Sequence, residues 1–143
     1  MPKLNTYLIF PGNTEEAFNF YKSVFGGEFM MVVRFKDMPM EGITIPAADQ
    51  NKIMHIGLSI GKDNFLMAAD TLDSHGQKLV QGNNYYICIA PDSKEEADKL
   101  FNALSAGGKI ENPIADQPWG DYYGSFTDKF GVQWMVDYAP PKK

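Results

Sequence analysis

The sequence contains an internal repeat with a spacing of 80 residues, and this repeat constrains the fold more than any other feature. Asn13 and Ser93 lie 80 residues apart, and each starts a segment with the pattern of a capped amphipathic helix. The same shift aligns the flanking chain without a gap: Ile9 with Ile89, Pro11 with Pro91, Glu15-Glu16-Ala17 with Glu95-Glu96-Ala97, and Gly27 with Gly107. Helix capping alone does not require the matched strand residue and proline. We therefore interpret the chain as two copies of one structural unit.

Each copy is predicted to contain one helix. Asn13 with Glu16, and Ser93 with Glu96, form capping-box patterns. A pair of glycines ends each helix, Gly26-Gly27 in the first copy and Gly107-Gly108 in the second. The predicted buried stripes are Ala17, Phe20, Tyr21 and Val24 in the first helix, and Ala97, Leu100, Phe101 and Leu104 in the second. Truncating Phe20 or Phe101 to alanine is therefore expected to cost about 3 to 5 kcal/mol.

One short strand is predicted before each helix and three strands after it. The leading strands, 7–10 and 85–90, each end at a proline, which cannot continue a hydrogen-bonded ladder. The following strands are 29–35, 53–60 and 65–69 in the first copy, then 110 onward, 122–127 and 132–138 in the second. The segments 61–64 and 128–131 have the composition of hairpin turns. Each copy is therefore a βαβββ module.

The predicted fold class is α+β, with two tandem βαβββ modules in a single domain covering residues 1–143. The modules span about 3–70 and 82–138. A four-stranded sheet with one helix leaves its other face uncovered, so two modules are expected to bury those faces against each other around an open, barrel-like cleft. Such a cleft is the expected place for a ligand. The long segment 36–51 is consistent with either a mobile lid or a plain surface loop.

Composition narrows the possible partners. A net charge of −5 without a cluster of Lys and Arg argues against nucleic acid and against anionic membranes. No signal peptide or apolar stretch of membrane-spanning length is present, so a cytoplasmic location is expected. Cys88 is the sole cysteine, which excludes an internal disulfide. Its apolar strand neighbours predict a core residue, with a reactive thiol as the alternative.

Four segments carry a resemblance to a known family. They are 4–10, 17–27, 53–60 and 118–134, and the last contains Trp119-Gly120-Asp121 and Phe126-Thr127-Asp128-Lys129-Phe130-Gly131. In these segments the chain resembles the PhnB-like branch of the glyoxalase/bleomycin resistance/dioxygenase (vicinal oxygen chelate) superfamily, often labelled 3-demethylubiquinone-9 3-methyltransferase-like. Tyr122 and Lys129 depart from that pattern, where a basic residue and a proline are common. No glycine-rich adenosylmethionine loop supports a methyltransferase.

The resemblance also implies where a metal would bind. Metal-dependent members place His, Gln or Glu on the first and last strand of each module, facing the cleft. The matching positions here are Thr6, Ala68, Tyr86 and Met135. A shift by one residue would bring in Asn5, Ala69, Tyr85 or Val136. Neither set contains an ordinary ligand for a divalent ion, so we expect no metal at this position and no cofactor.

The favoured function is that of a metal-free protein that binds a small-molecule ligand. The predicted pocket residues are Thr6, Tyr7, His55, Tyr86, Trp119 and Met135, whereas Trp134 is expected in the core and His75 in a solvated loop. The alternative is a metal-dependent isomerase, lyase or dioxygenase with a variant site near His55, drawing ligands from His55, Asp70, Asp121 and Asp137. A third reading is an interaction scaffold, because superfamily members commonly form homodimers. Catalytic residues are unknown, and whether the protein is an enzyme stays open.

Overall fold

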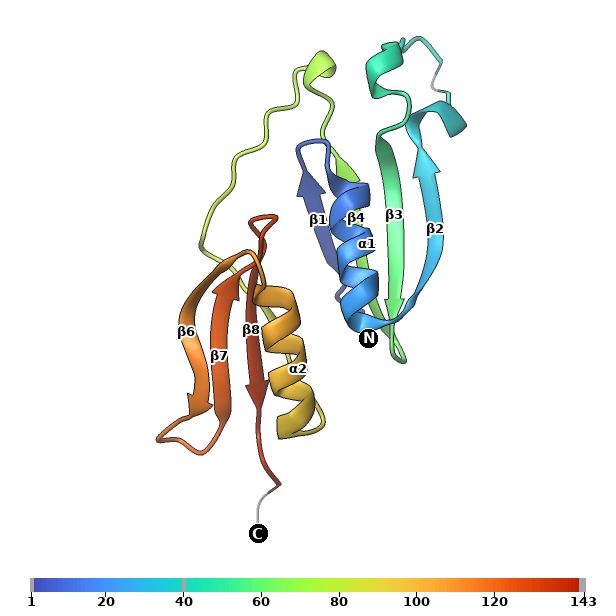
Figure 1. The fold of residues 1–143 in the computed structure, drawn as a ribbon. Helices are drawn as coiled ribbons and strands as arrows, with labels where there is room; N and C mark the ends of the chain where they lie inside the picture. The colour runs from blue at the N-terminus through green and yellow to red at the C-terminus, as the bar shows by residue number, and fades with distance from the viewer. Residues whose placement is uncertain (1, 40, 142–143) are drawn as a thin grey trace. The chain divides into compact units, whose positions relative to one another are not determined.

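The structure is a computed structural model that describes residues 2–39 and 41–141. It divides into two compact units, Met1–Val80 and Gln81–Lys143, which we call module 1 and module 2. The elements of module 1 are β1 (Thr6–Phe10), α1 (Thr14–Phe25), β2 (Glu28–Arg34), β3 (Ile53–Ile60) and β4 (Asn64–Asp70). Those of module 2 are β5 (Ile87–Ile89), α2 (Lys94–Ser105), β6 (Lys109–Asp116), β7 (Tyr122–Thr127) and β8 (Gln133–Tyr138). Figure 1 shows each helix lying along one face of the sheet of its own module.

The two modules have the same topology. Sheet 1 has the strand order β1-β4-β3-β2 and sheet 2 the order β5-β8-β7-β6. In each sheet the first strand runs parallel to the last, and the remaining neighbours are antiparallel. The predicted α+β fold with two βαβββ modules is confirmed. Within the described ranges no strand ladder joins the two sheets, so they are not closed into a barrel.

The 80-residue repeat holds for the helices but not for the strands that lead into them. Both ends of α1 and α2 are separated by 80 residues. The connection from β1 to α1 covers residues 11–13, whereas that from β5 to α2 covers 90–93 and is one residue longer. Because side chains alternate between the faces of a strand, this extra residue reverses which face each matched position occupies.

The 80-residue repeat pairs Thr6 with Tyr86 and therefore predicts that the two residues occupy equivalent strand positions. Thr6 lies an even number of residues before the buried Leu8 and Phe10 and is in register with the buried Leu66. It therefore points to the helix side of sheet 1. In sheet 2 the helix side is taken by Ile87 and Ile89, which pair with buried Trp134 and Val136. Tyr86 therefore lies on the opposite side, and the predicted equivalence is wrong.

The buried stripe of α1 also differs from the prediction. Thr14, Ala17, Phe18 and Tyr21 are buried, whereas Phe20 is only half-buried. The Phe18 ring lies edge-on to the rings of Phe10 and Tyr21, with centroid distances of 6.4 and 5.7 Å. The choice of Phe20 as the core residue was wrong, because a stripe through 14, 17, 18 and 21 follows helical spacing as well as one through 17, 20, 21 and 24.

In α2 the predicted Ala97, Phe101 and Leu104 are buried, while Leu100 is half-buried. The Phe101 ring packs edge-on against Phe126 of β7, with the ring centroids 5.0 Å apart. The assignment of Phe101 to the core is confirmed.

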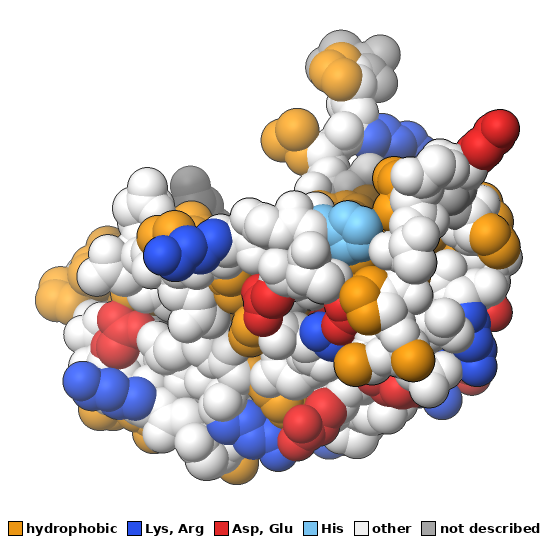
Figure 2. All heavy atoms as spheres, turned by 90° about the horizontal axis from the view of Figure 1, so that it is seen from above, with side chains coloured by type: hydrophobic (Ala, Val, Ile, Leu, Met, Phe, Trp, Pro, Cys, Tyr) orange, Lys and Arg blue, Asp and Glu red, His pale blue; other side chains and the backbone are white. Residues whose placement is uncertain are grey.

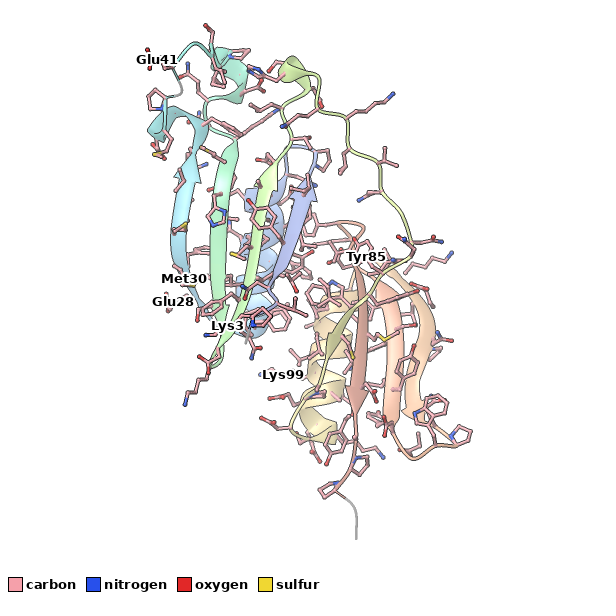
Figure 3. The ribbon with its side chains drawn as sticks, turned by 180° about the vertical axis from the view of Figure 1, so that it is seen from behind. Lys3, Glu28, Met30, Glu41, Tyr85 and Lys99 are labelled. Atoms are coloured by element: carbon pink, nitrogen blue, oxygen red, sulfur yellow. The ribbon has the colours of Figure 1, made fainter. Side chains whose placement is uncertain are left out.

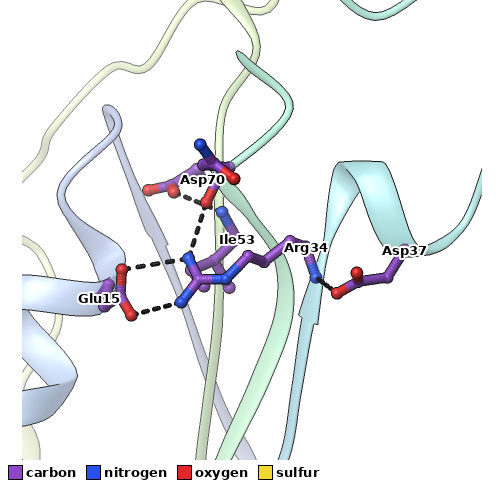
Figure 4. Close-up of polar contacts among 6 residues, drawn as sticks. Glu15, Arg34, Asp37, Ile53 and Asp70 are labelled. Carbon is purple, nitrogen blue, oxygen red and sulfur yellow. Dashed lines mark hydrogen bonds and ion pairs between the residues drawn. The ribbon is translucent and has the colours of Figure 1, made fainter. Parts of the chain in front are cut away.

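The N-terminus of α1 is capped from a distance. Asn13 makes no capping hydrogen bond. Instead, the buried carboxylate of Asp70, at the end of β4, accepts bonds from the backbone N–H and the hydroxyl of Thr14, at 3.0 and 2.6 Å. Its second oxygen accepts the backbone N–H of Ile53 at 2.8 Å (Figure 4). In α2 the predicted cap is present, because the Ser93 hydroxyl accepts the Glu96 N–H at 3.0 Å.

An aspartate also organises the final hairpin of module 2. One oxygen of the buried Asp128 carboxylate accepts the backbone N–H groups of Phe130 and Val132 at 2.8 and 3.0 Å. The other oxygen accepts the indole N–H of Trp134 at 2.9 Å. Trp134 is 2% exposed, which confirms its expected place in the core. One carboxylate therefore links the turn to the largest side chain of the core.

The segment 36–51 is held near both of its ends. Arg34 forms an ion pair with Glu15 of α1 and bonds the carbonyl of Asn51 at 2.8 Å (Figure 4). Near the other end, Asp49 accepts the Ser74 hydroxyl at 2.6 Å and pairs with Lys52 at 2.8 Å. These contacts anchor the segment to the rest of module 1. Whether its middle opens as a lid stays a prediction.

In the described part of the chain, no helix is long and apolar enough to cross a membrane. Charged side chains of both signs and hydrophobic side chains are interspersed over the face seen in Figure 2. This mixture is typical of a solvated protein surface.

Candidate functional site

Each sheet has one face covered by its helix and one face that the helix leaves open. In sheet 1 the buried Leu8, Ile56, Leu58, Leu66 and Ala68 point toward α1. Their neighbours along the strands point the other way, toward the viewer of Figure 3, where the sheet lies in front of its helix. We call this surface the open face of sheet 1, and it consists of Tyr7, Ile9, Glu28, Met31, Val33, His55, Gly57, Ser59, Phe65, Met67 and Ala69.

Tyr7 and His55 form a polar pair on this otherwise largely apolar surface. The phenol oxygen of Tyr7 lies 3.1 Å from Nδ1 of His55, within hydrogen-bonding distance. The two ring centroids are 5.6 Å apart, with the planes tilted by 31°. The residues come from β1 and β3, so the pair reaches across β4, which lies between those strands. Partial burial raises the pKa of Tyr7, and the phenol is therefore protonated at neutral pH.

Methionines surround this pair. Met67 is in register with Tyr7 on one side and with Gly57 on the other, and Met31 is also in register with Gly57. A Cβ atom at Gly57 would lie 3.9 Å from both Met67 Cγ and Met30 Cβ, so the missing side chain leaves the methionines adjacent to one another. Met30 lies on the edge strand β2 (Figure 3). Flexible thioether side chains adapt to ligands of different shape.

The corresponding face of sheet 2 is more polar. The Tyr86 hydroxyl donates to Glu111 at 2.6 Å, and the Thr127 hydroxyl donates to the other carboxylate oxygen at 3.0 Å. The hydrogen bond to Glu111 raises the pKa of Tyr86. Met135 lies on the same face, in register with Cys88 and Ser125. The predicted pocket residues Tyr86 and Met135 therefore share the open face of sheet 2.

Cys88 lies on this face as well, and the prediction of a core residue was wrong. The side chain is exposed because β5 is an edge strand and Cys88 points away from α2. Partial desolvation, followed by the charge of Asp137, raises the pKa of the Cys88 thiol. The thiol is therefore mostly uncharged near neutral pH, which disfavours the reactive thiolate.

Two of the alternative metal ligands lie close to each other. Asp137 is in register with Tyr123 on the open face of sheet 2, its Oδ1 is buried without a hydrogen-bonding partner among the described residues, and the carboxyl group of Asp121 lies close to it. Desolvation, followed by the nearby Asp121 carboxyl group, raises the pKa of Asp137. Asp70 is committed to the helix cap of module 1. Within residues 2–39 and 41–141, no three His, Cys, Asp or Glu side chains gather into a group that could hold a metal ion.

The strand faces change which residues occupy the superfamily's metal positions in module 1. Ala68 points toward α1, as Thr6 does, so the open-face neighbours in module 1 are Tyr7 and Met67, which are in register. In module 2 the positions remain Tyr86 and Met135. In each module the pair is one neutral phenol and one thioether, which do not suit a hard or borderline divalent ion, and ionising a phenol near neutrality would cost further free energy. These residues do not fit a metal centre.

The remaining predicted site residues are dispersed. Trp119 is 65% exposed in the turn between β6 and β7, and its ring lies 6.2 Å from that of Tyr123. Thr6 is directed to the helix side. His75 is exposed, as expected, but it borders a small apolar hollow together with Phe35, Ile43, Ile45, Leu72 and Gln77. The sequence analysis predicted Met135 but not Met30, Met31, Met67 or Glu111. Their positions on the open faces follow only from the strand register.

Comparison with known proteins decides the family. The model of the glyoxalase/bleomycin resistance protein/dioxygenase superfamily matches residues 3–136. The chain belongs to this superfamily.

Relatives of this superfamily member include protein YjdN of Escherichia coli strain K12, 29% identical over 144 residues and covering 94% of this chain and 93% of that protein. Among solved structures, protein PA1353 from Pseudomonas aeruginosa is 37% identical, with a TM-score of 0.85 over 97% of this chain and 98% of the other. The PhnB protein from Bacillus cereus is 26% identical, with a TM-score of 0.75 over 96% and 100% of the two chains. The resemblance to the PhnB-like branch is therefore supported.

Calorimetric titration of this superfamily member with Zn²⁺, Ni²⁺, Mn²⁺ and Fe²⁺ is expected to show no stoichiometric site. Its melting temperature should also be the same with and without chelator. The reason is that the phenol and thioether of each module, Tyr7 with Met67 and Tyr86 with Met135, are weak donors for such ions. One tightly bound ion per chain that disappears in the His55→Ala variant would contradict this expectation and favour the metal-dependent alternative.

Proposed function

We propose that this protein binds an uncharged, largely apolar small molecule on the open face of sheet 1, without a metal ion. The observation that carries the proposal is the Tyr7–His55 pair, set among Ile9, Met31 and Met67 on the face that α1 does not cover. A binding surface needs apolar area for affinity and a few polar groups for orientation. This face combines both.

Burial of apolar surface supplies the driving force. At roughly 25 cal/mol per Å² of apolar area removed from water, a ligand that covers about 200 Å² of this face gains about 5 kcal/mol before the cost of association. The Tyr7 side chain is 46% exposed, so it can still contribute contact area. The face carries no Lys or Arg, and its one acidic residue, Glu28, lies at the start of β2 in register with Ser59. This position is away from Tyr7 and His55, which favours an uncharged ligand beside the pair.

The metal-dependent isomerase, lyase or dioxygenase has less support. Its candidate ligands are His55, Asp70, Asp121 or Asp137. Asp70 is instead bonded to Thr14 and Ile53, and Asp121 lies close to Asp137. We also propose that the protein is cytoplasmic and forms a homodimer. Sedimentation of the purified protein tests the homodimer.

Ligand-observed NMR with a library of uncharged aromatic fragments tests this function. Hits are expected to shift the backbone amide signals of Tyr7, His55 and Met67. Met67→Ala should weaken their binding about five- to tenfold, because it removes apolar contact area. Met38→Ala is a matched control, since it truncates an exposed methionine that is not part of the open face of sheet 1. Hits that shift only signals outside the open face of sheet 1, or that respond equally to both variants, would sink the proposal.

A further inference from the structure

We infer that Tyr7 holds the ring proton of His55 on Nε2, so that His55 presents a hydrogen-bond donor and the site selects apolar ligands that carry an uncharged oxygen acceptor. Ketones, aldehydes, esters and amides belong to this class. The inference rests on the proposed function, which it extends from a binding surface to a ligand chemistry.

The direction of the hydrogen bond between Tyr7 and His55 decides which ring nitrogen carries the proton. A neutral imidazole has one nitrogen that donates and one that accepts. A phenol O–H is much more acidic than a neutral imidazole N–H, so between these two groups the phenol is the stronger donor. At 3.1 Å the favoured arrangement has the Tyr7 hydroxyl donating to Nδ1 of His55. The ring proton then resides on Nε2.

The surroundings of His55 Nε2 are mostly apolar. In the described part of the chain this nitrogen has no hydrogen-bonding partner, and the residues beside it on the open face are mostly apolar. Ile56 is in register with Ala68, which places His55 next to the small side chain of Ala69. Val33 is the neighbour on the other side. A donor bordered by small and apolar side chains is satisfied by an acceptor that the ligand brings.

The charges near His55 determine whether the ligand's acceptor is ionised or neutral. No Lys or Arg stands among the open-face residues to compensate a carboxylate or phosphate. Their one acidic residue, Glu28, is in register with Ser59, four residues along β3 from His55, so an amine paired with Glu28 would lie away from the Nε2 donor. Removing an ionised group from water without such a partner is costly. An uncharged carbonyl oxygen loses little hydration and gains the Nε2–H bond. The chemistry of the face therefore favours carbonyl compounds over both anions and cations.

The tautomer can be observed without any ligand. Long-range ¹H–¹⁵N correlation spectra at about pH 8.5 distinguish the protonated ring nitrogen of a neutral histidine from the bare one. His55 is expected as the Nε2–H form in the unmodified protein and as a mixture of both forms in Tyr7→Phe. His75 serves as an internal control, and its spectrum should be the same in both proteins. A His55 ring with its proton on Nδ1 would overturn the inference while leaving the proposed function intact.

Matched probes then test the ligand class. Acetophenone and ethylbenzene have similar size and shape, but only acetophenone carries an oxygen acceptor. Acetophenone is expected to bind about five- to tenfold more tightly, the range of one net hydrogen bond, and His55→Phe should abolish the difference. Equal binding of both probes by the unmodified protein overturns the ligand class but supports an apolar site. Binding of neither probe, with the expected tautomer present, counts against the proposed function itself.

Discussion

Phe18→Ala is expected to lower the free energy of unfolding by about 3 to 5 kcal/mol, whereas Phe20→Ala should lower it by about 1 kcal/mol. Phe18 is fully buried and contacts the rings of Phe10 and Tyr21, so its removal leaves a cavity under α1. Phe20 is half-buried, and water can occupy the space that its truncation leaves. The two variants remove the same atoms from one helix, so the difference between them reports burial alone.

Urea unfolding followed by circular dichroism measures both changes. Phe101→Ala is the matched variant in module 2, with an expected loss similar to that of Phe18→Ala, since Phe101 is 2% exposed. Helix propensity acts in the same direction at both positions of α1 and cancels in the comparison. Equal losses for Phe18→Ala and Phe20→Ala would contradict the orientation of α1 on sheet 1.

Asp128→Ala is expected to cost about 3 kcal/mol, because it leaves three donors without their shared acceptor. Two are the backbone N–H groups of Phe130 and Val132, and the third is the buried indole N–H of Trp134. Replacement of a buried hydrogen-bonded carboxylate removes charge-assisted bonds and opens a small void at the same time. The emission of Trp134 should also change, since its indole loses a polar partner.

Asp128→Asn is the informative companion. Its amide oxygen can still accept the two backbone N–H groups, but its NH₂ group would face the indole N–H, so about half of the loss should remain. Asp116→Ala is a control at an exposed ion pair with Lys94 and should change stability by less than about 0.5 kcal/mol. A loss for Asp128→Ala no larger than that of the control would refute the hydrogen-bond account of this turn.

The sequence was sufficient to predict the elements and their duplication. The spacing of Asn13 and Ser93, the paired glycines and the turn segments predict two βαβββ modules, and the structure has them at nearly the predicted bounds. These features depend on local interactions, namely helix propensity, glycine conformation and hairpin turns, which a short segment carries by itself. The family resemblance follows from the same segments and is confirmed by the match over residues 3–136.

Some errors arose where a side chain's role depends on residues far away in the chain. Asn13 has the composition of a helix cap, but Asp70, which lies 56 residues beyond Thr14, provides the acceptor. Phe18 and Phe20 both fit an amphipathic pattern, and only the position of sheet 1 decides between them. Local propensity cannot distinguish such alternatives, because the deciding contacts form only when the sheet is assembled.

The candidate site depends on which face of its strand each side chain occupies, and a difference of one residue in a connection changes that face. The connection between β5 and α2 is one residue longer than that between β1 and α1. Thr6 therefore lies on the helix side of sheet 1, with Tyr7 on the open face, whereas Tyr86, the repeat partner of Thr6, lies on the open face of sheet 2. The sequence alone determined which residue types occupy the first strands, and those already argued against a metal centre. Only the tertiary structure decided which of them share a face, and it brought Tyr7 and His55 together across β4. The physical reason is that side chains alternate with a period of two, so register, rather than composition, selects the residues that a ligand can reach.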